Sequence, residues 1–182
     1  MTALAIRARF PLGIFLGHHA DGQPARYPDA ARLHAALLHS AGKGSLAVAT
    51  DGDLRAAPTS LAALQWLESH PPSAISLPGC VIAALPGGTT TSFRDEGVFN
   101  AEKGKAPTRR RMPKSQSDAV ALDGPFGWAW EEDAPAEVVQ TIARLCEDVS
   151  CLGEADTPVI LEVGDIEPVS YTHLTLPTNR EV

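Results

Sequence analysis

The sequence predicts a two-layer α+β domain with a mostly antiparallel sheet, and a ferredoxin-like (RRM-like) arrangement fits it best. Segments in which every second residue is apolar occur along the chain between segments whose apolar residues follow a helical period. Their order is strand, helices, strand, a long insertion, strands, helix and strand, which suits the split β-α-β arrangement. The 182 residues are enough to bury one sizeable core.

The first elements are a strand and a helix. Apolar and other residues alternate over 4–10, which indicates a half-buried strand, and apolar residues resume beyond Pro11, so the strand can continue there. A polar loop is expected over 17–27. A helix is predicted over 28–42, because leucines recur at helical spacing and Gly42 can end it.

A second helix is predicted just before the His-Pro-Pro sequence at 70–72, which stops it. Thr59 or Ser60 is expected to cap its start. The connection over 44–57 is ambiguous, because it allows a short strand but the Asp-Gly-Asp sequence at 51–53 is typical of a turn.

The insertion follows an extended apolar stretch over 74–85 that Pro78-Gly79 interrupts. Residues 86–117 are polar and rich in Gly, Thr, Pro and basic side chains, with no helical or strand period. We therefore predict a long irregular loop, which in a compact domain is usually functional or disordered.

The remaining elements are two strands, a helix and a strand. Residues 119–122 and 126–130 are predicted strands around a turn at 123–125, and the aromatic residues of the second strand share one face. The two tryptophans among them are expected to pack in the core. A helix over 136–149 and an alternating strand over 159–163 follow.

The charge of the chain is unevenly distributed. The formal net charge of −7 taken alone argues against a nucleic-acid partner. One short stretch is strongly basic, however, and arginine and lysine are the side chains that bind phosphate. A loop of this kind can clasp a single-stranded backbone, whereas a solvated, disordered charge run is the alternative. The basic residues are Lys103, Lys105, Arg109, Arg110, Arg111 and Lys114.

Known catalytic motifs are missing from the sequence. It contains no phosphate-binding glycine loop, no Gly-x-Ser-x-Gly elbow, no HExxH and no CxxC pair. The three cysteines provide neither a disulfide framework nor zinc-site spacing. Nothing in the sequence therefore supports a nucleotide hydrolase, a serine hydrolase or a zinc enzyme, and we expect no cofactor and no metal.

The sequence also predicts where in the cell the protein is located. No apolar run approaches the roughly 20 residues that cross a bilayer. The arginines among the first residues are unlike a secretory signal. We expect a cytoplasmic protein without a membrane partner.

The C-terminal residues 169–182 are unlike the rest of the chain. The sequence from Val169 to Thr178 resembles the translation of a transposon-end adapter used in sequencing libraries. We therefore predict one module over 1–168, a natural chain that continues beyond Pro168, and residues 169–182 that are not natural protein. A genuine strand over 169–176 is the alternative, since its β-branched and aromatic content permits one.

Several segments together resemble one family. Leu4-Ala-Ile-Arg-Ala-Arg-Phe-Pro-Leu-Gly13, the Gly-His-His loop and the Pro-x-x-Ala-Arg-Leu helix are similar to the start of a CRISPR-associated subunit of type I-U (I-G) systems. That subunit fuses a module that binds the five-prime handle of the guide RNA to a module that processes the guide. Further pieces occur in the family's order: 62–68, Val98-Phe-Asn100, Gly127-Trp-Ala-Trp130, 142–145 and Cys151-Leu-Gly153.

The resemblance implies a RAMP-superfamily fold with two ferredoxin-like modules in tandem. It implies binding of crRNA and pre-crRNA, association with other subunits of an effector complex, and a role in antiviral defence. The family cleaves precursor RNA without metal, and its cleavage centre belongs to the second module, so this chain is expected to bind RNA without cleaving it. His18, His19 and Arg32 are further candidate RNA contacts. One departure is Glu154-Ala155, where the family usually has Arg-Ser.

Two other interpretations remain open. The chain can be a stand-alone ferredoxin-like domain that binds proteins and has no RNA role. It can also be an active ribonuclease in which His18 or His19 acts as a general base.

Overall fold

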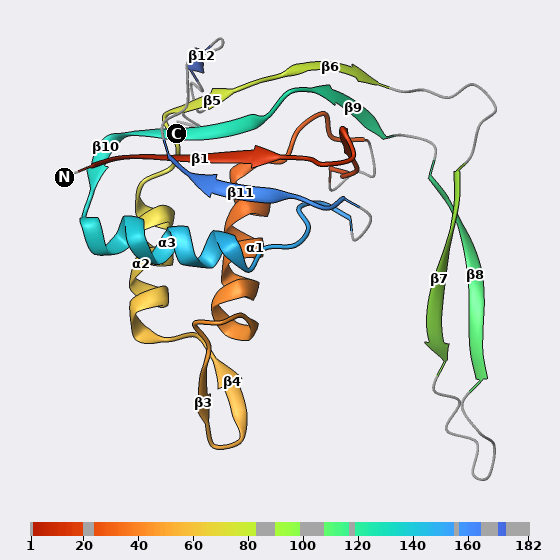
Figure 1. Cartoon of the computed structure of the whole chain (residues 1–182), viewed down its shortest axis with the longest axis horizontal. Helices are drawn as coiled ribbons and strands as arrows, with labels where there is room; N and C mark the ends of the chain where they lie inside the picture. The colour runs from red at the N-terminus through yellow and green to blue at the C-terminus, as the bar shows by residue number, and fades with distance from the viewer. Residues whose placement is uncertain are drawn as a thin grey trace, which may run out of the picture.

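A five-stranded antiparallel sheet with helices on one face forms the body of the protein (Figure 1). The computed structural model describes residues 2–19, 24–82, 90–98, 108–116, 119–154, 157–164 and 171–173, and it describes 2–3, 81–82, 90–98, 108–116 and 171–173 by their backbone alone. The strand order is β11 (Ile160–Val163), β1 (Thr2–Arg9), β10 (Phe126–Ala134), β5 (Ala74–Ser76) and β12 (Tyr171–His173).

The helices connect strands that are not neighbours along the chain. Helices α1 (Ala30–Lys43) and α2 (Pro58–Ser69) lie between β1 and β5, and α3 (Ala136–Glu147) lies between β10 and β11. The resulting connectivity and the order β11-β1-β10-β5 are those of a split β-α-β unit. The predicted α+β class with an antiparallel sheet is therefore confirmed.

The core lies between the sheet and the helices, where the sequence pattern placed it. Along β1, Leu4, Ile6 and Ala8 are fully buried, whereas Arg7 and Arg9 are exposed. On β10, Trp128 is 1% exposed and Trp130 is 5% exposed, so the prediction that both tryptophans pack in the core is confirmed. From α3 the buried residues are Val138, Ile142, Leu145 and Cys146.

Helix α1 is capped at both ends. Asp29 caps its start, since its Oδ1 accepts a hydrogen bond from the Arg32 amide at 2.6 Å. Its end was predicted at Gly42, but the helix continues to Lys43. Gly44 caps it there, with its amide donating to the Ser40 carbonyl at 2.7 Å.

Helix α2 begins without the side-chain cap that was predicted. Ala57 is its N-cap and makes no side-chain capping bond, and Pro58 occupies the first turn. Proline lacks an amide proton and has a helical φ, so it starts a helix without such a cap. Thr59 and Ser60 lie inside the helix, and Ser60 is fully buried. The predicted end at His70 is confirmed.

The ambiguous segment between the helices is a hairpin. Strands β3 (Val48–Thr50) and β4 (Asp53–Arg55) pair in antiparallel fashion. At the turn, Asp51 has a φ of 53° and Gly52 a φ of 85°. Two successive positive φ values are typical of the tight turns that match the twist of paired strands.

The first strand does not continue past Pro11. A turn at Gly13, with a φ of 64°, redirects the chain, and the Gly13 amide donates to the Phe10 carbonyl at 2.9 Å. Strand β2 (Ile14–Phe15) therefore joins a second sheet, of order β2-β9-β6, with β9 (Val120–Asp123) and β6 (Gly79–Ile82).

The turn predicted at 123–125 is a bend and does not fold the two strands onto each other. Strand β9 pairs with β6, while β10 pairs with β5. Gly124, with a φ of 116°, lies at the bend. The successive strands β5–β6 and β9–β10 thus form one long, bent antiparallel pair, which runs out of the main sheet (Figure 1).

This long pair leads into a two-stranded ribbon. Strands β7 (Thr90–Val98) and β8 (Thr108–Gln116) pair in antiparallel register from Thr90 opposite Gln116 to Val98 opposite Thr108. The prediction of an irregular loop is therefore wrong for these residues. Backbone hydrogen bonds between two strands need no apolar alternation, which explains why the sequence pattern did not reveal them. Figure 1 shows the ribbon extending away from the body.

Two further predictions concern the ends and the environment of the chain. Strand β12 lies within 169–182 and pairs with the outer edge of β5, so a short strand forms there. That residues 169–182 are not natural protein stays a prediction.

None of the helices in the described part of the chain has the length and apolar character needed to cross a membrane.

Candidate nucleic-acid interface

The loop after β2 brings two of the predicted RNA contacts together. The Arg32 side chain, from the first turn of α1, donates a hydrogen bond through Nη2 to the His18 carbonyl at 2.7 Å. Its guanidinium also lies over the Phe15 ring, 5.7 Å from the centroid. A Cβ at Gly17 would meet the Arg32 side chain, so glycine allows this close approach.

The guanidinium of Arg32 keeps unused hydrogen-bonding capacity. Its Nη1 is buried and has no hydrogen-bond partner within the described residues. Since a guanidinium offers five N–H groups in a planar fork, an anion such as phosphate is the ligand that this group suits best. The placement of Arg32 and His18 is thus compatible with a phosphate contact.

A carboxylate that the sequence did not identify as a partner lies beside His18. Glu154 Oε1 is 3.0 Å from His18 Nδ1. The Glu154 amide also donates to the Leu16 carbonyl at 2.9 Å, and Leu16 exchanges hydrogen bonds with the buried Thr157 hydroxyl. The loop around residue 154 is therefore fastened to the strand that precedes His18. A carboxylate paired with an imidazole can orient it for proton transfer or can hold the loop in place.

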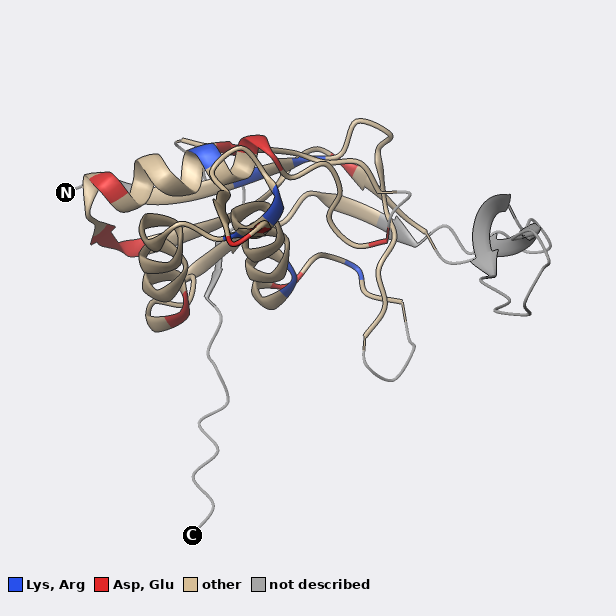
Figure 2. Cartoon of the chain, turned by 90° about the horizontal axis from the view of Figure 1, so that it is seen from below, with Lys and Arg blue, Asp and Glu red and all other residues tan. Residues whose placement is uncertain are grey.

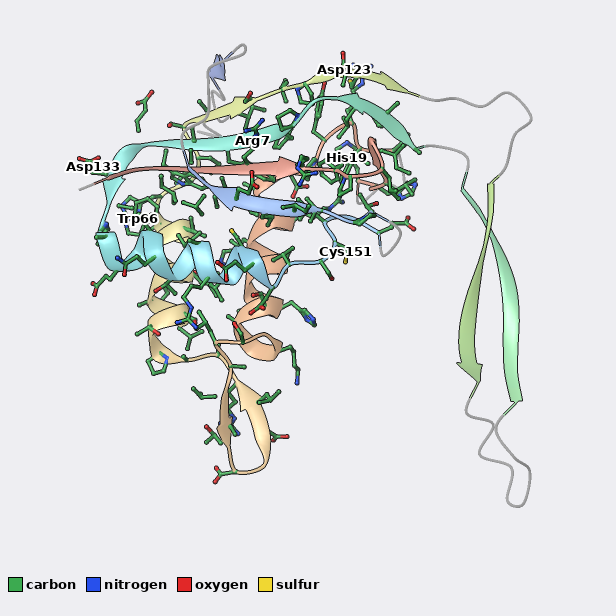
Figure 3. The ribbon with its side chains drawn as sticks, in the orientation of Figure 1. Arg7, His19, Trp66, Asp123, Asp133 and Cys151 are labelled. Carbon is green, nitrogen blue, oxygen red and sulfur yellow. The ribbon has the colours of Figure 1, made fainter. Side chains whose placement is uncertain are left out.

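His19 is exposed and follows His18 directly. Figure 3 shows His19 at the same end of the body as Asp123 of β9 and Cys151. Because β2 pairs with β9, the His18–His19 loop lies near the place where the long strand pair leaves the body. The His18–His19 loop therefore lies at the end of the body from which the strand pair extends toward the ribbon.

The predicted basic residues divide between the ribbon and the segment outside the described residues. Arg109, Arg110, Arg111 and Lys114 lie on β8, whereas Lys103 and Lys105 lie outside the described residues. In the register, Arg110 lies opposite Glu96 and Arg111 opposite Asp95. Strand β7 carries one arginine, one aspartate and one glutamate, while β8 carries three arginines and one lysine, so the ribbon is net positive.

The described part of the body has an excess of acidic residues, with 13 Asp and Glu side chains and 7 Lys and Arg side chains, so the basic excess is confined to the ribbon. Figure 2 shows acidic and basic residues interspersed over its described part. Within that part, no group of three or more His, Cys, Asp or Glu side chains is arranged to hold a metal ion. Cationic side chains such as those of the ribbon are the groups that commonly contact the phosphates of nucleic acids.

One partly buried tyrosine, Tyr27, connects the segment before α1 to the base of the strand pair. The Tyr27 hydroxyl donates to Cys80 Sγ at 2.9 Å and lies 3.2 Å from the Pro78 carbonyl, and its ring stacks on Phe126. Burial, followed by the hydrogen bond with Cys80, raises the pKa of Tyr27 from 10.0 to about 12. Tyr27 is therefore neutral at physiological pH and acts as a structural link.

Comparisons with known proteins found similarity to solved structures but not to known sequences. Neither a protein-family model nor a curated protein sequence matches the chain. A solved structure, Cas6 of Thermus thermophilus, is similar with a TM-score of 0.39 and 15% sequence identity, over 88% of this chain and 53% of that one. This chain thus corresponds to about half the length of that protein.

Proposed function

We propose that this chain binds crRNA and its precursor as the N-terminal RAMP-superfamily module of a type I-U CRISPR effector subunit. In this proposal it acts in antiviral defence together with other subunits of the effector complex. The observation that carries the proposal is the basic ribbon. Arg109, Arg110 and Arg111 are consecutive on β8, at the end of a strand pair that begins in the main sheet.

The ribbon suits a nucleic-acid backbone for two physical reasons. Nine residues of strand at about 3.3 Å each give β8 a length of roughly 30 Å, enough to lie along several nucleotides. Arginine binds phosphate through two parallel N–H groups, so consecutive arginines provide several charge-assisted contacts. Lys103 and Lys105 extend the same basic stretch in sequence.

Arg32 and His18 provide a second proposed contact. Arg32 has a buried N–H group without a partner among the described residues, and it lies beside the loop that follows β2. A strand of RNA that follows the ribbon to its base reaches this loop. Because Glu154 lies 3.0 Å from His18, we expect Arg32 to contribute more to phosphate binding than His18 does.

The proposal is tested by the salt dependence of RNA binding. Each phosphate contact to single-stranded RNA contributes about −0.7 to the slope of log K against log salt. Replacing Arg109, Arg110 and Arg111 by alanine is therefore expected to make this slope less steep by about 2, measured by fluorescence anisotropy with single-stranded repeat RNA.

The matched control removes three exposed basic residues elsewhere on the body, Lys43, Arg55 and Arg144. This control has the same net charge as the ribbon variant and is expected to keep the wild-type slope. Equal losses in the two variants, or binding that salt does not affect, would contradict the proposal and favour a protein-binding domain.

A second candidate function rests on the His18–Glu154 pair, which can orient the imidazole as a general base. We propose binding without cleavage, because the cleavage centre of the family belongs to its second module. Incubation with repeat RNA in the presence of a chelator distinguishes the two. Site-specific cleavage that the double change His18→Ala, His19→Ala abolishes would establish the ribonuclease.

A further inference from the structure

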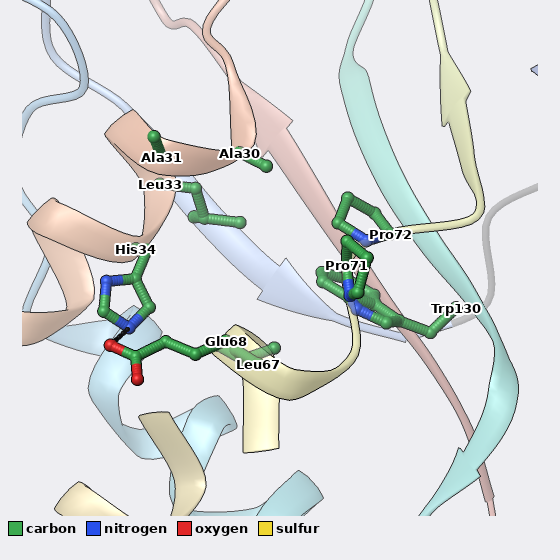
Figure 4. A pocket seen from close by; sticks show the side chains of 9 residues that line it. All are labelled: Ala30, Ala31, Leu33, His34, Leu67, Glu68, Pro71, Pro72 and Trp130. Atoms are coloured by element: carbon green, nitrogen blue, oxygen red, sulfur yellow. Dashed lines mark ion pairs between the residues drawn. The ribbon is translucent and has the colours of Figure 1, made fainter. Parts of the chain in front are cut away.

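A pocket of about 310 Å³ opens between α1, α2 and β10, and none of the contacts described above uses it. Figure 4 shows side chains from α1 on one side, from the end of α2 below, and from β10 behind two prolines. Ligand pockets typically begin at about 300 Å³, so this one suits a single planar group rather than a large ligand. Its lining includes Ala31, His34, Glu68, Pro71, Pro72 and Trp130.

Ring side chains make up much of the wall, and the indole of Trp130 is the planar, aromatic one among them. Pro71 and Pro72 stand in front of the indole of Trp130 (Figure 4). Trp130 Nε1 already donates to the His70 carbonyl at 2.6 Å, so its ring offers the pocket an apolar surface and no hydrogen bond. Such walls favour a planar, aromatic ligand.

One polar pair faces the pocket. His34 Nε2 is 3.3 Å from Glu68 Oε1, which joins α1 to the end of α2. The Glu68 side chain is 61% exposed, so its carboxylate lies at the solvent edge of the cavity. The pocket therefore provides a carboxylate acceptor at the edge of an apolar cavity.

We propose that this pocket binds a nucleobase of the RNA, with guanine preferred. The inference rests on the proposed function and specifies a base contact within it. Guanine carries two adjacent N–H donors in one plane, at N1 and at the 2-amino group, and a carboxylate accepts such a pair. Guanine therefore matches both parts of the site, with its ring against the apolar wall and its donor edge at the Glu68 carboxylate, and an arginine of a protein partner is the competing ligand in the test.

The position of the pocket agrees with an RNA that also contacts Arg32. Ala31 and His34 line the pocket from the same N-terminal part of α1 that carries Arg32. Positions two residues apart point to different sides of a helix, so Arg32 faces the His18 loop while its neighbours face the pocket. One RNA strand that crosses the start of α1 can therefore place a phosphate at Arg32 and a base in the pocket.

The test uses free nucleosides with the purified 182-residue chain, because nucleosides lack the phosphates that the ribbon is proposed to bind. Saturation-transfer-difference NMR measures the affinity for guanosine, inosine, adenosine, cytidine and uridine. Inosine differs from guanosine only by the missing 2-amino group. We expect it to bind about tenfold more weakly, since a hydrogen bond to a charged acceptor is lost.

Two variants and a control complete the test. Glu68→Gln is expected to reduce guanosine binding about tenfold and to remove its advantage over inosine. Glu147→Gln, an exposed glutamate at the end of α3, is the matched control and is expected to change nothing. Ala31→Leu keeps helix propensity but fills the mouth of the pocket, so it is expected to weaken the binding of every nucleoside.

The outcomes separate this inference from the proposed function. No nucleoside binding, equal binding of all five nucleosides, or guanosine binding that Glu68→Gln leaves unchanged would each overturn the pocket assignment. Tighter binding of N-acetyl-arginine amide than of guanosine would overturn it in favour of a protein side chain. The salt dependence conferred by Arg109, Arg110 and Arg111 is unaffected by any of these results, so either proposal can fail alone.

Discussion

Replacing Gly153 by alanine tests how the loop beside the candidate RNA contacts is held. Gly153 has a φ of 109°, a conformation that L-amino acids rarely adopt. A Cβ at this position meets the Leu16 carbonyl oxygen and lies 3.0 Å from Cε2 of the Phe15 ring. The substitution therefore forces the loop away from the segment that leads to His18.

The expected loss of stability follows from these contacts. A residue held in a rarely populated backbone region costs about 1–3 kcal/mol. Moving the loop also breaks the hydrogen bond between the Glu154 amide and the Leu16 carbonyl, worth about 1 kcal/mol, and disturbs the packing of Phe15. The free energy of unfolding is therefore expected to fall by about 2–4 kcal/mol.

Thermal unfolding followed by circular dichroism measures this effect. For a chain of this size, 1 kcal/mol corresponds to about 2–4 °C, so Gly153→Ala is expected to lower Tm by roughly 4–16 °C. The control is Gly164→Ala, because a Cβ at Gly164 has no atom within 4 Å and its φ is not in the left-handed region. A Gly153→Ala protein that unfolds at the same temperature as this control would refute the described docking of the loop.

Three further predictions concern other parts of the fold. Gly42→Ala is expected to raise the free energy of unfolding by about 0.5–1 kcal/mol in urea titrations, because glycine inside a helix is destabilising relative to alanine. Gly42 lies inside α1, and a Cβ at this position has no atom within 4 Å. Destabilisation would contradict that placement. Burial, together with the charge of Glu147, raises the pKa of the Cys146 thiol to about 12, so mass spectrometry after iodoacetamide treatment at neutral pH should find Cys146 unmodified in the folded protein and modified in urea. Because the pKa of Tyr27 is raised to about 12, its contribution to stability is fully present below about pH 10 and is lost as the pH rises through about 12. The difference in tyrosinate absorbance between the wild-type chain and Tyr27→Phe should have its midpoint near pH 12. A midpoint near pH 10 would contradict the placement of the hydroxyl.

The predictions that agree best with the structure are those based on residues close together in the sequence. The alternation over β1 and the helical spacing over α1 and α3 follow from burial of one face, and that periodicity is a property of the local sequence. Local signals were less reliable at element ends. Proline at the start of α2 replaced the expected cap at Thr59 or Ser60, because a first-turn proline needs no capping side chain.

The candidate site was predicted only in part. The residue types selected from the sequence suit a phosphate partner, and Arg32 and His18 lie together, but that they bind RNA stays a prediction. In the sequence, Glu154 was noted only because the family that the chain resembles usually has arginine at this position. The structure places the Glu154 carboxylate beside His18, which lies 136 residues earlier in the chain. No local pattern reports such a pair, because it depends on how two distant loops pack.

The sequence by itself determined the α+β class, the positions of the main helices and strands, and the basic stretch around Arg109–Arg111, since each depends on composition or on short-range periodicity. Only the tertiary structure decided that β9 pairs with β2 and β6 and that the basic stretch forms a ribbon with β7. It also decided that His34 and Glu68 meet in a pocket behind Pro71. The physical reason is that backbone hydrogen bonds between strands and contacts between distant side chains depend on the path of the whole chain, which the apolar pattern of a single segment does not encode.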